Sequence, residues 1–386
     1  DYPHVYYVDG DAQKFDVNIF TPDSTHLHGW GTILVVTMRF GGGEITFDPN
    51  SDTDANLTDD VTLRSSVMIF DVTDPEQPPT LLAELSHEEL GYTTSTPALY
   101  KSRSKDANGN IDSANDSWIL VLGSGPAGTD AAAKRGALVN AESNQTALLF
   151  GIDLNTMDWA WGGPQSTAQT ASFVGDVATM DWDNDYIDDA IYFGTVGGSA
   201  ASPTGNLMRF RPDGLIMEEM LASGKAHTSA PLPLLDKENR RWVYSGTGRF
   251  FVAEDILSVA PQSFYGIKEA DDLSITSIST TTLVNTTDVE IFEGGQADVG
   301  AHPTISTYGL DSIDTFDALK MALPESDAHG WTIDFSTGGR NLLSPILLRD
   351  VLVFDEYDFY YSKDVDFTSL SSLELREFTR VVELRS

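Results

Sequence analysis

Residues 181–193 read DWDNDYIDDAIYF, in which a short acidic turn runs directly into an apolar strand. The next apolar run, LMRF at 207–210, follows after a stretch rich in glycine and small polar residues. Apolar, β-branched and aromatic runs of about four to eight residues between turn residues are typical of β-strands. This stretch therefore predicts two strands, with a turn of aspartates in front of the first.

The same pattern recurs along the whole chain. The predicted strands are 5–8, 32–38, 67–72, 118–122, 147–152, 190–193, 207–210, 242–245, 264–267, 331–335 and 351–354. Only two short segments, 215–221 and 370–378, have the apolar spacing of a helix. With 32 Gly and 17 Pro to form turns, the sequence predicts an all-β fold.

The length narrows this class further. An all-β chain of 386 residues without a visible linker predicts a large sandwich, a β-helix or a propeller, and the lack of a short strict repeat disfavours the β-helix. We expect a β-propeller in which residues 1–386 form a single domain. The polar segments 47–60 and 101–117 are then long acidic surface loops rather than linkers.

The charge excludes several kinds of partner. The chain has 59 acidic and 23 basic residues, a net charge of −36, so it repels nucleic acids and anionic lipid surfaces. The absence of cysteine excludes disulfides, Cys-zinc sites, iron–sulfur clusters and thiol catalysis. No apolar stretch approaches the roughly 20 residues of a membrane span, and the chain starts at Asp1 without a leader, which indicates a soluble, processed product or a fragment.

The acidic turn predicts a calcium site. Asp181, Asp183, Asp185 and Asp189 occupy loop positions 1, 3, 5 and 9, and Ile187 at position 7 can offer its backbone carbonyl. Calcium binds six to eight hard oxygens, and alternate residues of a tight loop can turn their carboxylates inward. The alternative interpretation is an acidic turn between strands that binds no metal.

The turn departs from the EF-hand pattern at two positions. Tyr186 stands at position 6, where glycine normally permits a sharp turn, and Tyr192 stands at position 12, where glutamate normally closes the shell. Asp189 can close a shorter loop, and Asn184 tolerates a left-handed conformation. Without a cation, the clustered carboxylates repel one another and raise their own pKa values.

Three further features suggest weaker sites. Two acidic runs, from Asp48 to Asp54 and from Asp106 to Asp112, share the alternate spacing but have no carboxylate at position 9, so each is either a second metal site or a solvated loop. The pair His26 and His28 is either a transition-metal site on a strand or, in the favoured interpretation, a polar turn.

A glycine fingerprint predicts a competing function. Residues 118–128, WILVLGSGPAG, place Gly123, Gly125 and Gly128 after a strand, as in dinucleotide-binding enzymes, with Asp153 as the candidate ribose-binding acid. The helix that such a site requires, from 129 to 145, lacks a sustained apolar stripe, and the chain lacks alternating strands and helices. We therefore favour a strand that ends in a glycine-rich turn.

The motifs in their order resemble the C-terminal β-propeller of PilY-type proteins, the type IV pilus tip-associated adhesins and biogenesis factors. The segments that carry the resemblance are HVYYVDGDAQKFDV (4–17), GWGTILVVTMRFGGG (29–43), VMIFDVTDP (67–75), LGYTTSTP (90–97), WILVLGSG (118–125), LLFGIDLNT (148–156), GDVATMDWDNDYIDDAIYFGTVGGS (175–199), GNLMRF (205–210), VYSGTGRFFVAED (243–255), QSFYGI (262–267) and GWTIDFSTGGR (330–340). The family has glycine where this chain has Asn184 and Tyr186, and the resemblance fades beyond about residue 355.

The resemblance implies a modified seven-bladed, quinoprotein-like propeller, with calcium held by Asp181, Asp183, Asp185 and Asp189 and by the carbonyl of Ile187. It implies a non-catalytic protein, exported through the periplasm to the pilus tip, that works with minor pilins, takes part in the control of pilus extension and retraction, and contributes to attachment to host or abiotic surfaces. The N-terminal von Willebrand A-like region of larger family members is absent from this sequence.

Two other functions remain open on the sequence. One is a propeller-type quinone- or flavin-dependent oxidoreductase, although the seven Trp lack the regular spacing of quinoprotein blades. The other is a structural surface module in which calcium is a static link. The adhesion ligand, the calcium affinity, the oligomeric state and the extent of any precursor are not specified by the sequence.

Overall fold

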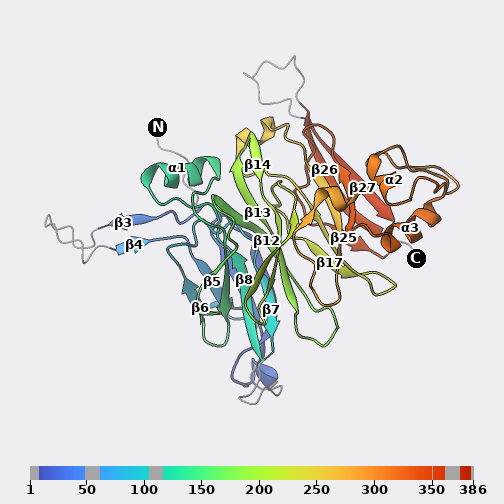
Figure 1. Cartoon of the computed structure of the whole chain (residues 1–386). Helices are drawn as coiled ribbons and strands as arrows, with labels where there is room; N and C mark the ends of the chain where they lie inside the picture. Colours follow the sequence, from blue (N-terminus) through green and yellow to red (C-terminus); the bar gives the residue numbers. More distant parts are fainter. Residues whose placement is uncertain (1–7, 48–60, 104–115, 350, 361–373, 384–386) are drawn as a thin grey trace. The chain divides into compact units, whose positions relative to one another are not determined.

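A computed structural model describes residues 8–47, 61–103, 116–349, 351–360 and 374–383 (Figure 1). The chain divides into two compact units, one of residues 1–177 and 185–188 and the other of residues 178–184 and 189–386. The boundary falls inside strand β12 (Ser172–Met180) and the acidic turn that follows it. Each unit is described separately.

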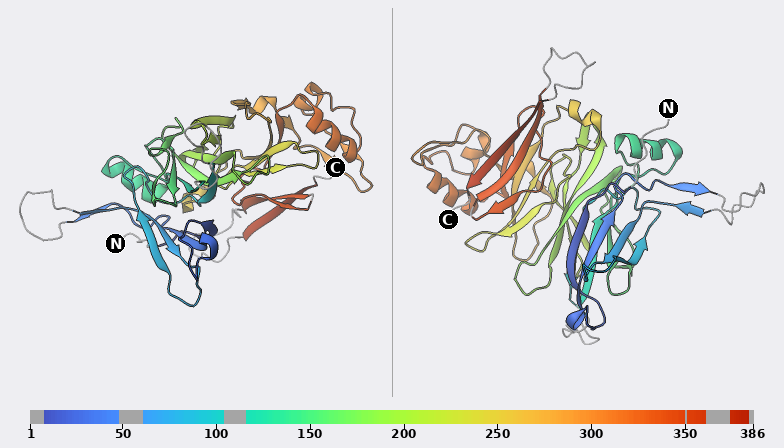
Figure 2. Two further views of the ribbon diagram at one scale, coloured as in Figure 1. Left: turned by 90° about the horizontal axis from the view of Figure 1, so that it is seen from below. Right: turned by 180° about the vertical axis from the view of Figure 1, so that it is seen from behind.

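The first unit contains two antiparallel sheets in mainly sequential order, shown from two further sides in Figure 2. The first sheet runs β1 (Ala12–Asn18), β2 (Trp30–Thr37), β5 (Val67–Asp71) and β6 (Thr80–Leu85). The second runs β7 (Ala98–Ser102), β8 (Ser117–Gly123), β9 (Leu148–Asp153) and β10 (Asp158–Trp159), with β11 (Gln165–Ser166) also paired to β9. The smaller elements are β3 (Ile45–Phe47), β4 (Val61–Leu63), the 3-10 turn η1 (Leu27–Gly29) and helix α1 (Ala131–Asn140).

Alternation of side chains explains these strands. In β2, Ile33 and Val35 are fully buried while their neighbours are partly exposed, the pattern of a strand with one face on a core. In β9, Leu149, Phe150 and Ile152 are all fully buried, because both faces of this strand are covered. Ile33, Val35, Phe150 and Ile152 belong to one apolar cluster that unites the two sheets of the unit.

The second unit contains two larger sheets and several small elements. One sheet includes β13 (Ala190–Ser199), β15 (Leu207–Arg211), β16 (Ile216–Ala222) and β20 (Ile278–Ser279), with β14 (Ser202–Thr204) on β13. The other runs β17 (Leu232–Leu235), β18 (Arg241–Gly246), β19 (Ser263–Glu269), β24 (Gly330–Asp334) and β21 (Val284–Asn285). The remaining elements are β22 (Glu290–Ile291), β23 (Ala297–Asp298), β25 (Ile346–Leu348), β26 (Val351–Tyr360), β27 (Glu374–Glu383), η3 (Ala253–Leu257), η4 (Thr280–Thr282), α2 (Pro303–Thr307) and α3 (Phe316–Glu325).

The all-β prediction is confirmed. Every predicted strand has a counterpart except the run 5–8, most of which lies outside the described residues. The segment 215–221 was wrongly given helical spacing, because it forms β16. A β-bulge between Leu207 and Met208 of the partner strand leaves Met220 and Leu221 both buried, which breaks the two-residue alternation that marks a strand in sequence.

A second correction concerns the segment after the glycine fingerprint. Residues 131–140 form α1 although they lack an apolar stripe. The Asp130 carboxylate caps the helix by accepting hydrogen bonds from the backbone N–H groups of Ala132 (2.9 Å) and Ala133 (3.0 Å). The cap and the high helix propensity of the Ala-rich first turn stabilise this helix, although it has no apolar face to bury.

Candidate metal-binding turn

The acidic turn connects β12 to β13, and two hydrogen bonds donated by backbone N–H groups close its base. The N–H of Asp189 donates to the Met180 carbonyl (2.8 Å), and the N–H of Trp182 donates to Asp189 Oδ2 (2.7 Å). These bonds fix the first and last aspartates of the turn near one another. The turn is therefore a closed loop on a strand pair rather than an extended connection.

Three of the four predicted aspartates come together. One carboxylate oxygen from each of Asp181, Asp183 and Asp189 lies within 4.8 Å of the other two. Two oxygens bound to one calcium at about 2.3–2.6 Å are at most about 5 Å apart, so this spacing fits a shared cation of that size. Among the described residues, it is the one cluster of three or more His, Asp or Glu side chains with such proximity.

The backbone adopts the conformation for which the family uses glycine. Asn184 has φ +58° and Tyr186 has φ +70°, both in the left-handed region. This conformation costs a residue with a Cβ roughly 1–2 kcal/mol, less for asparagine, whose side chain bonds locally. Tyr186 is 83% exposed, so its side chain meets no steric barrier at the tip of the turn. The replacement of glycine by Asn184 and Tyr186 thus leaves the sharp turn intact.

The electrostatics of the cluster favour a cation. Burial raises the pKa of Asp189, and the neighbouring charges of Asp183 and Asp181 raise it further, against the hydrogen bond from the Trp182 N–H. A divalent cation would relieve this repulsion, because it replaces like-charge contacts with opposite-charge ones.

The other predicted ligands have different contacts. Asp185 forms an ion pair with Arg103 (Oδ2 to Nη1, 2.7 Å) and accepts a hydrogen bond from the Ile187 N–H (3.0 Å). Asp188, which the sequence did not single out, accepts a hydrogen bond from the Lys101 N–H (2.7 Å) and so stabilises the first unit. The roles of Asp185 and of the Ile187 carbonyl as ligands stay predictions.

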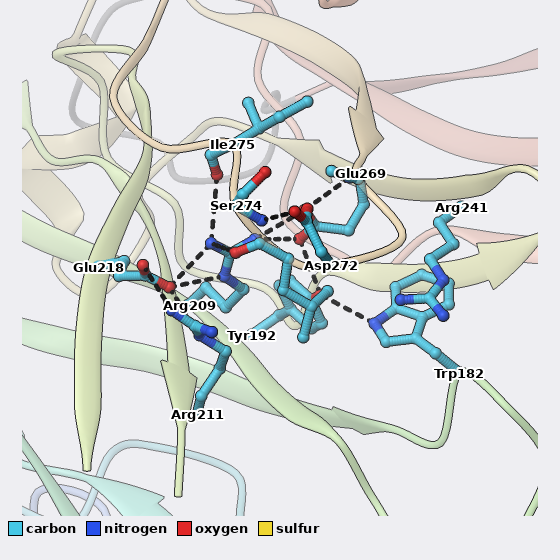
Figure 3. Close-up of polar contacts among 12 residues, drawn as sticks. Trp182, Tyr192, Arg209, Arg211, Glu218, Arg241, Glu269, Asp272, Ser274 and Ile275 are labelled. Atoms are coloured by element: carbon cyan, nitrogen blue, oxygen red, sulfur yellow. Dashed lines mark hydrogen bonds and ion pairs between the residues drawn. The ribbon is translucent and has the colours of Figure 1, made fainter. Parts of the chain in front are cut away.

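Trp182, which stands between two of the clustered aspartates, anchors the turn to the second unit (Figure 3). Its indole N–H donates to the Tyr192 hydroxyl (3.0 Å), and the two rings meet edge to face at 6.1 Å. The guanidinium of Arg241 lies 5.4 Å from the centre of the Trp182 ring. With only 2% of its surface exposed, Trp182 holds the neighbouring aspartates on a rigid base.

The anchor continues into a buried ion pair. The Tyr192 hydroxyl donates to Glu269 Oε2 (2.9 Å), and both Glu269 oxygens accept hydrogen bonds from Arg209 Nη1 at 2.6 Å (Figure 3). Arg209 Nη2 also donates to the Leu273 carbonyl (2.6 Å) and to Glu218 Oε2 (2.8 Å). Burial opposes the charge of Arg209, but Glu269 and Glu218 outweigh it and raise the pKa of the guanidinium. Burial, followed by the charge of Glu269, raises the pKa of Tyr192 well above its usual value.

The glycine fingerprint serves internal packing. A Cβ on Gly125 would lie 1.6 Å from the Tyr92 carbonyl oxygen, and one on Gly128 would lie 2.2 Å from the backbone of α1. The Asp130 carboxylate occupies the helix N-terminus that a pyrophosphate would need. The chain itself fills this turn, as the favoured interpretation of the sequence predicts.

The remaining candidate metal sites are the histidine pair and the two acidic runs. Both ring nitrogens of His26 face carboxylates, Asp71 at 3.0 Å and Asp23 at 3.2 Å, and the ring stacks on Phe20 at 4.1 Å, as in a polar turn. The acidic runs from Asp48 to Asp54 and from Asp106 to Asp112 lie outside the described residues.

No family model matches the chain. It is 23% identical over 393 aligned residues to a type IV pilus biogenesis factor PilY1 homolog of Xylella fastidiosa, and the match covers 92% of this chain and 22% of that protein. The chain thus spans less than a quarter of the length of this relative. The crystal structure of the Pseudomonas aeruginosa PilY1 C-terminal domain matches with a TM-score of 0.57 and 17% identity over 91% of this chain and 68% of that one.

The fold is a β-propeller with an acidic turn between two of its strands, as the sequence predicts. The resemblance of this chain to the PilY-type family is confirmed, because it extends over nine-tenths of the chain in both sequence and structure. Within the described residues, no helix combines the length and apolarity needed to cross a membrane.

Proposed function

We propose that this chain is a calcium-binding, non-catalytic part of a type IV pilus biogenesis protein. The observation that carries the calcium assignment is the convergence of Asp181, Asp183 and Asp189 within 4.8 Å on a closed, rigidly anchored turn. The pilus assignment rests on the similarity to the PilY1 homolog. Asp185 and the Ile187 carbonyl complete the proposed set of ligands.

The proposal places the protein outside the cell, exported through the periplasm to the pilus tip. Its partners are minor pilins and other tip proteins, and it contributes to attachment to host or abiotic surfaces. The excess of acidic residues supports an environment in which divalent cations are plentiful, because cations screen a net charge of −36. Calcium bound at the turn orders β12 and β13, whose connection the turn forms, and so affects the balance between pilus extension and retraction.

Thermal unfolding in excess calcium and in excess chelator tests the metal site. A ligand that binds only the folded state stabilises it by about 2.7 kcal/mol at a hundredfold excess over Kd, so calcium raises the Tm. The expected result is a Tm increase that Asp183→Asn abolishes and that Asp311→Asn, a substitution of an exposed aspartate outside the turn, leaves intact. Equal calcium shifts in all three proteins would contradict the assignment.

The role of Asp185 has its own test. If Asp185 binds the cation, it must first give up its ion pair with Arg103. Arg103→Ala should then lower the Kd for calcium, measured by isothermal titration. An unchanged Kd would remove Asp185 from the ligand set without affecting the other three aspartates.

The pilus role is tested in cells. Full-length protein with Asp183→Asn should alter the amount of surface pili and the motility that depends on retraction, whereas Asp311→Asn should not. Normal piliation in the Asp183→Asn strain, combined with lost calcium binding in vitro, would leave the metal site in place and overturn its regulatory role.

A further inference from the structure

Trp182 contacts the predicted calcium ligands through its backbone and the core of the second unit through its side chain. Its backbone N–H donates to Asp189 Oδ2 (2.7 Å), and Asp181 and Asp183 are its neighbours in the chain. A movement of Trp182 therefore shifts the backbone that carries two of the carboxylates and the hydrogen bond that holds the third. The contacts that fix its indole ring also fix the arrangement of carboxylates that a cation would meet.

Two pairs of strands position the groups around this indole ring (Figure 3). In the antiparallel register, Tyr192 of β13 lies directly opposite Arg209 of β15, and Glu269 at the end of β19 lies directly opposite Arg241 of β18. The two pairs belong to the two larger sheets of the second unit. The hydrogen bond from the Tyr192 hydroxyl to Glu269 Oε2 (2.9 Å) joins these sheets, so the anchor of Trp182 is built on strands rather than on loops.

The Tyr192 hydroxyl can link the indole to Glu269 because it both accepts and donates a hydrogen bond. An indole N–H only donates, and a carboxylate in an ion pair only accepts. The hydroxyl accepts from Trp182 Nε1 (3.0 Å) and donates to Glu269, so each of its two bonds has a fixed direction. Tyr192 and the side chain of Glu269 have no exposed surface, so bulk water does not compete for either bond.

The far end of this chain of contacts is fixed as well. Glu269 accepts from Arg209 Nη1, and Arg209 Nη2 donates to the carbonyls of Leu273 (2.6 Å) and Ile275 (3.2 Å). Groups that folding has already ordered lose little further freedom when a ligand binds, and this preorganisation increases affinity. The same argument applies to the carboxylates that Trp182 carries.

We propose that Tyr192 is a positioning residue for calcium: its hydroxyl orients Trp182, and Trp182 holds the three clustered aspartates in the arrangement that binds the ion. This inference rests on the proposed function and adds to it a source of affinity outside the set of ligands. It also gives a role to position 12 of the turn, where an EF-hand has its closing glutamate. Tyr192 occupies that position and extends to Glu269 in the core.

Calcium titration of Tyr192→Phe, at a temperature where the metal-free protein is fully folded, tests this role. Loss of a group that orients a metal ligand directly weakens affinity about 10–100-fold, and Tyr192 acts one residue further away, so we expect the Kd to rise about fivefold or more. Tyr265→Phe is the matched control, because it removes a buried hydroxyl that bonds to Ser263 instead, and it should leave the Kd unchanged. An unchanged Kd in Tyr192→Phe, or an equal rise in both variants, would overturn the proposal.

A double-mutant cycle tests the route through Trp182. Trp182→Phe removes the other partner of the same hydrogen bond and should also raise the Kd. If the hydroxyl acts through the indole, the Kd of the double variant lies within about twofold of that of Trp182→Phe alone. Effects that multiply in the double variant would refute the positioning of Trp182 by Tyr192.

Amide hydrogen exchange in excess chelator provides a measurement that needs no calcium. The N–H groups of Trp182 and Asp189 close the base of the turn, and both should exchange faster in Tyr192→Phe than in the unaltered protein or in Tyr265→Phe. Unchanged exchange would contradict the positioning role. If the unaltered protein binds no calcium, the proposed function fails, whereas the exchange rates still decide whether Tyr192 holds the turn in place.

Discussion

The stability of this chain depends strongly on a few polar residues that are shielded from water. Arg209 is fully buried, and its charge is balanced by Glu269 inside the unit and by Glu218 nearer the surface. Asp176, a partly buried residue of β12, the strand that precedes the acidic turn, accepts a hydrogen bond from the Thr96 N–H (2.7 Å). Such groups are costly when a partner is removed, because the remaining charge stays desolvated.

The first prediction concerns the buried pair. Glu269→Gln keeps the side-chain volume but leaves Arg209 without its principal counter-charge, so we expect the free energy of unfolding to fall by about 3 kcal/mol. Urea unfolding measures this loss. Glu218→Gln, in which Arg209 keeps Glu269, is the control and should lose less; equal losses would show that the inner carboxylate has no special role.

The second prediction concerns pH. Burial raises the pKa of Asp176 from 3.8 to about 6. The folded state therefore holds this proton more tightly than the unfolded state does, so the stabilising contribution is complete below about pH 4 and is lost as pH rises through about 6. Asp176→Asn should be more stable than the unaltered protein by about 2 kcal/mol at pH 7 and equally stable near pH 4.

Thermal melts across this pH range provide the measurement. The exposed Asp213→Asn serves as the control, since its effect on Tm should be small at every pH. A stability difference for Asp176→Asn that does not change between pH 4 and pH 7 would disprove the linkage.

At the scale of the element, the acidic turn contains backbone strain that a single substitution can relieve. Tyr186 has a left-handed backbone and an exposed side chain, so glycine should relieve the backbone strain at this position. We expect Tyr186→Gly to raise the free energy of unfolding by about 0.5–1 kcal/mol, since the greater entropy of glycine in the unfolded chain offsets part of the gain. Asn184→Gly should change it less, because asparagine tolerates this conformation. Urea unfolding measures the change. A lower free energy of unfolding in Tyr186→Gly would contradict the interpretation that the backbone at Tyr186 is strained.

The strands could be predicted from sequence because their apolar residues are contiguous or alternate. The helices α1 and α3 could not, because α1 depends on the cap at Asp130, and α3 is short, starts at a cap on Thr315 and contains Pro324. The convergence of Asp181, Asp183 and Asp189 followed from their spacing. The ion pair of Asp185 with Arg103 did not, since their contact depends on how distant segments of one unit meet.

At the scale of the whole molecule, the dominant property is the net charge of −36. Self-repulsion destabilises a compact state, and salt screens it over about 10 Å at 0.1 M ionic strength. We expect the Tm to rise by several degrees between low salt and about 0.5 M NaCl. Tetramethylammonium chloride should act similarly if the effect is screening, and a Tm that falls with both salts would refute the explanation.

Screening and specific binding are separable in this chain. Asp183→Asn should retain the salt-dependent rise while losing the response to calcium, because one acid among 59 barely alters the overall repulsion. A loss of both responses in this variant would mean that the turn itself dominates the electrostatic instability.

The position of Trp182 makes its fluorescence a probe of the acidic turn. Its indole is buried beside Tyr192 and Arg241, while its neighbours in sequence are two of the clustered carboxylates. A cation that moves those carboxylates changes the field around the ring and hence its fluorescence emission. Occupancy of the turn can therefore be followed without a label, and the spectrum of Trp182→Phe, subtracted from that of the unaltered protein, isolates this one fluorophore from the other six.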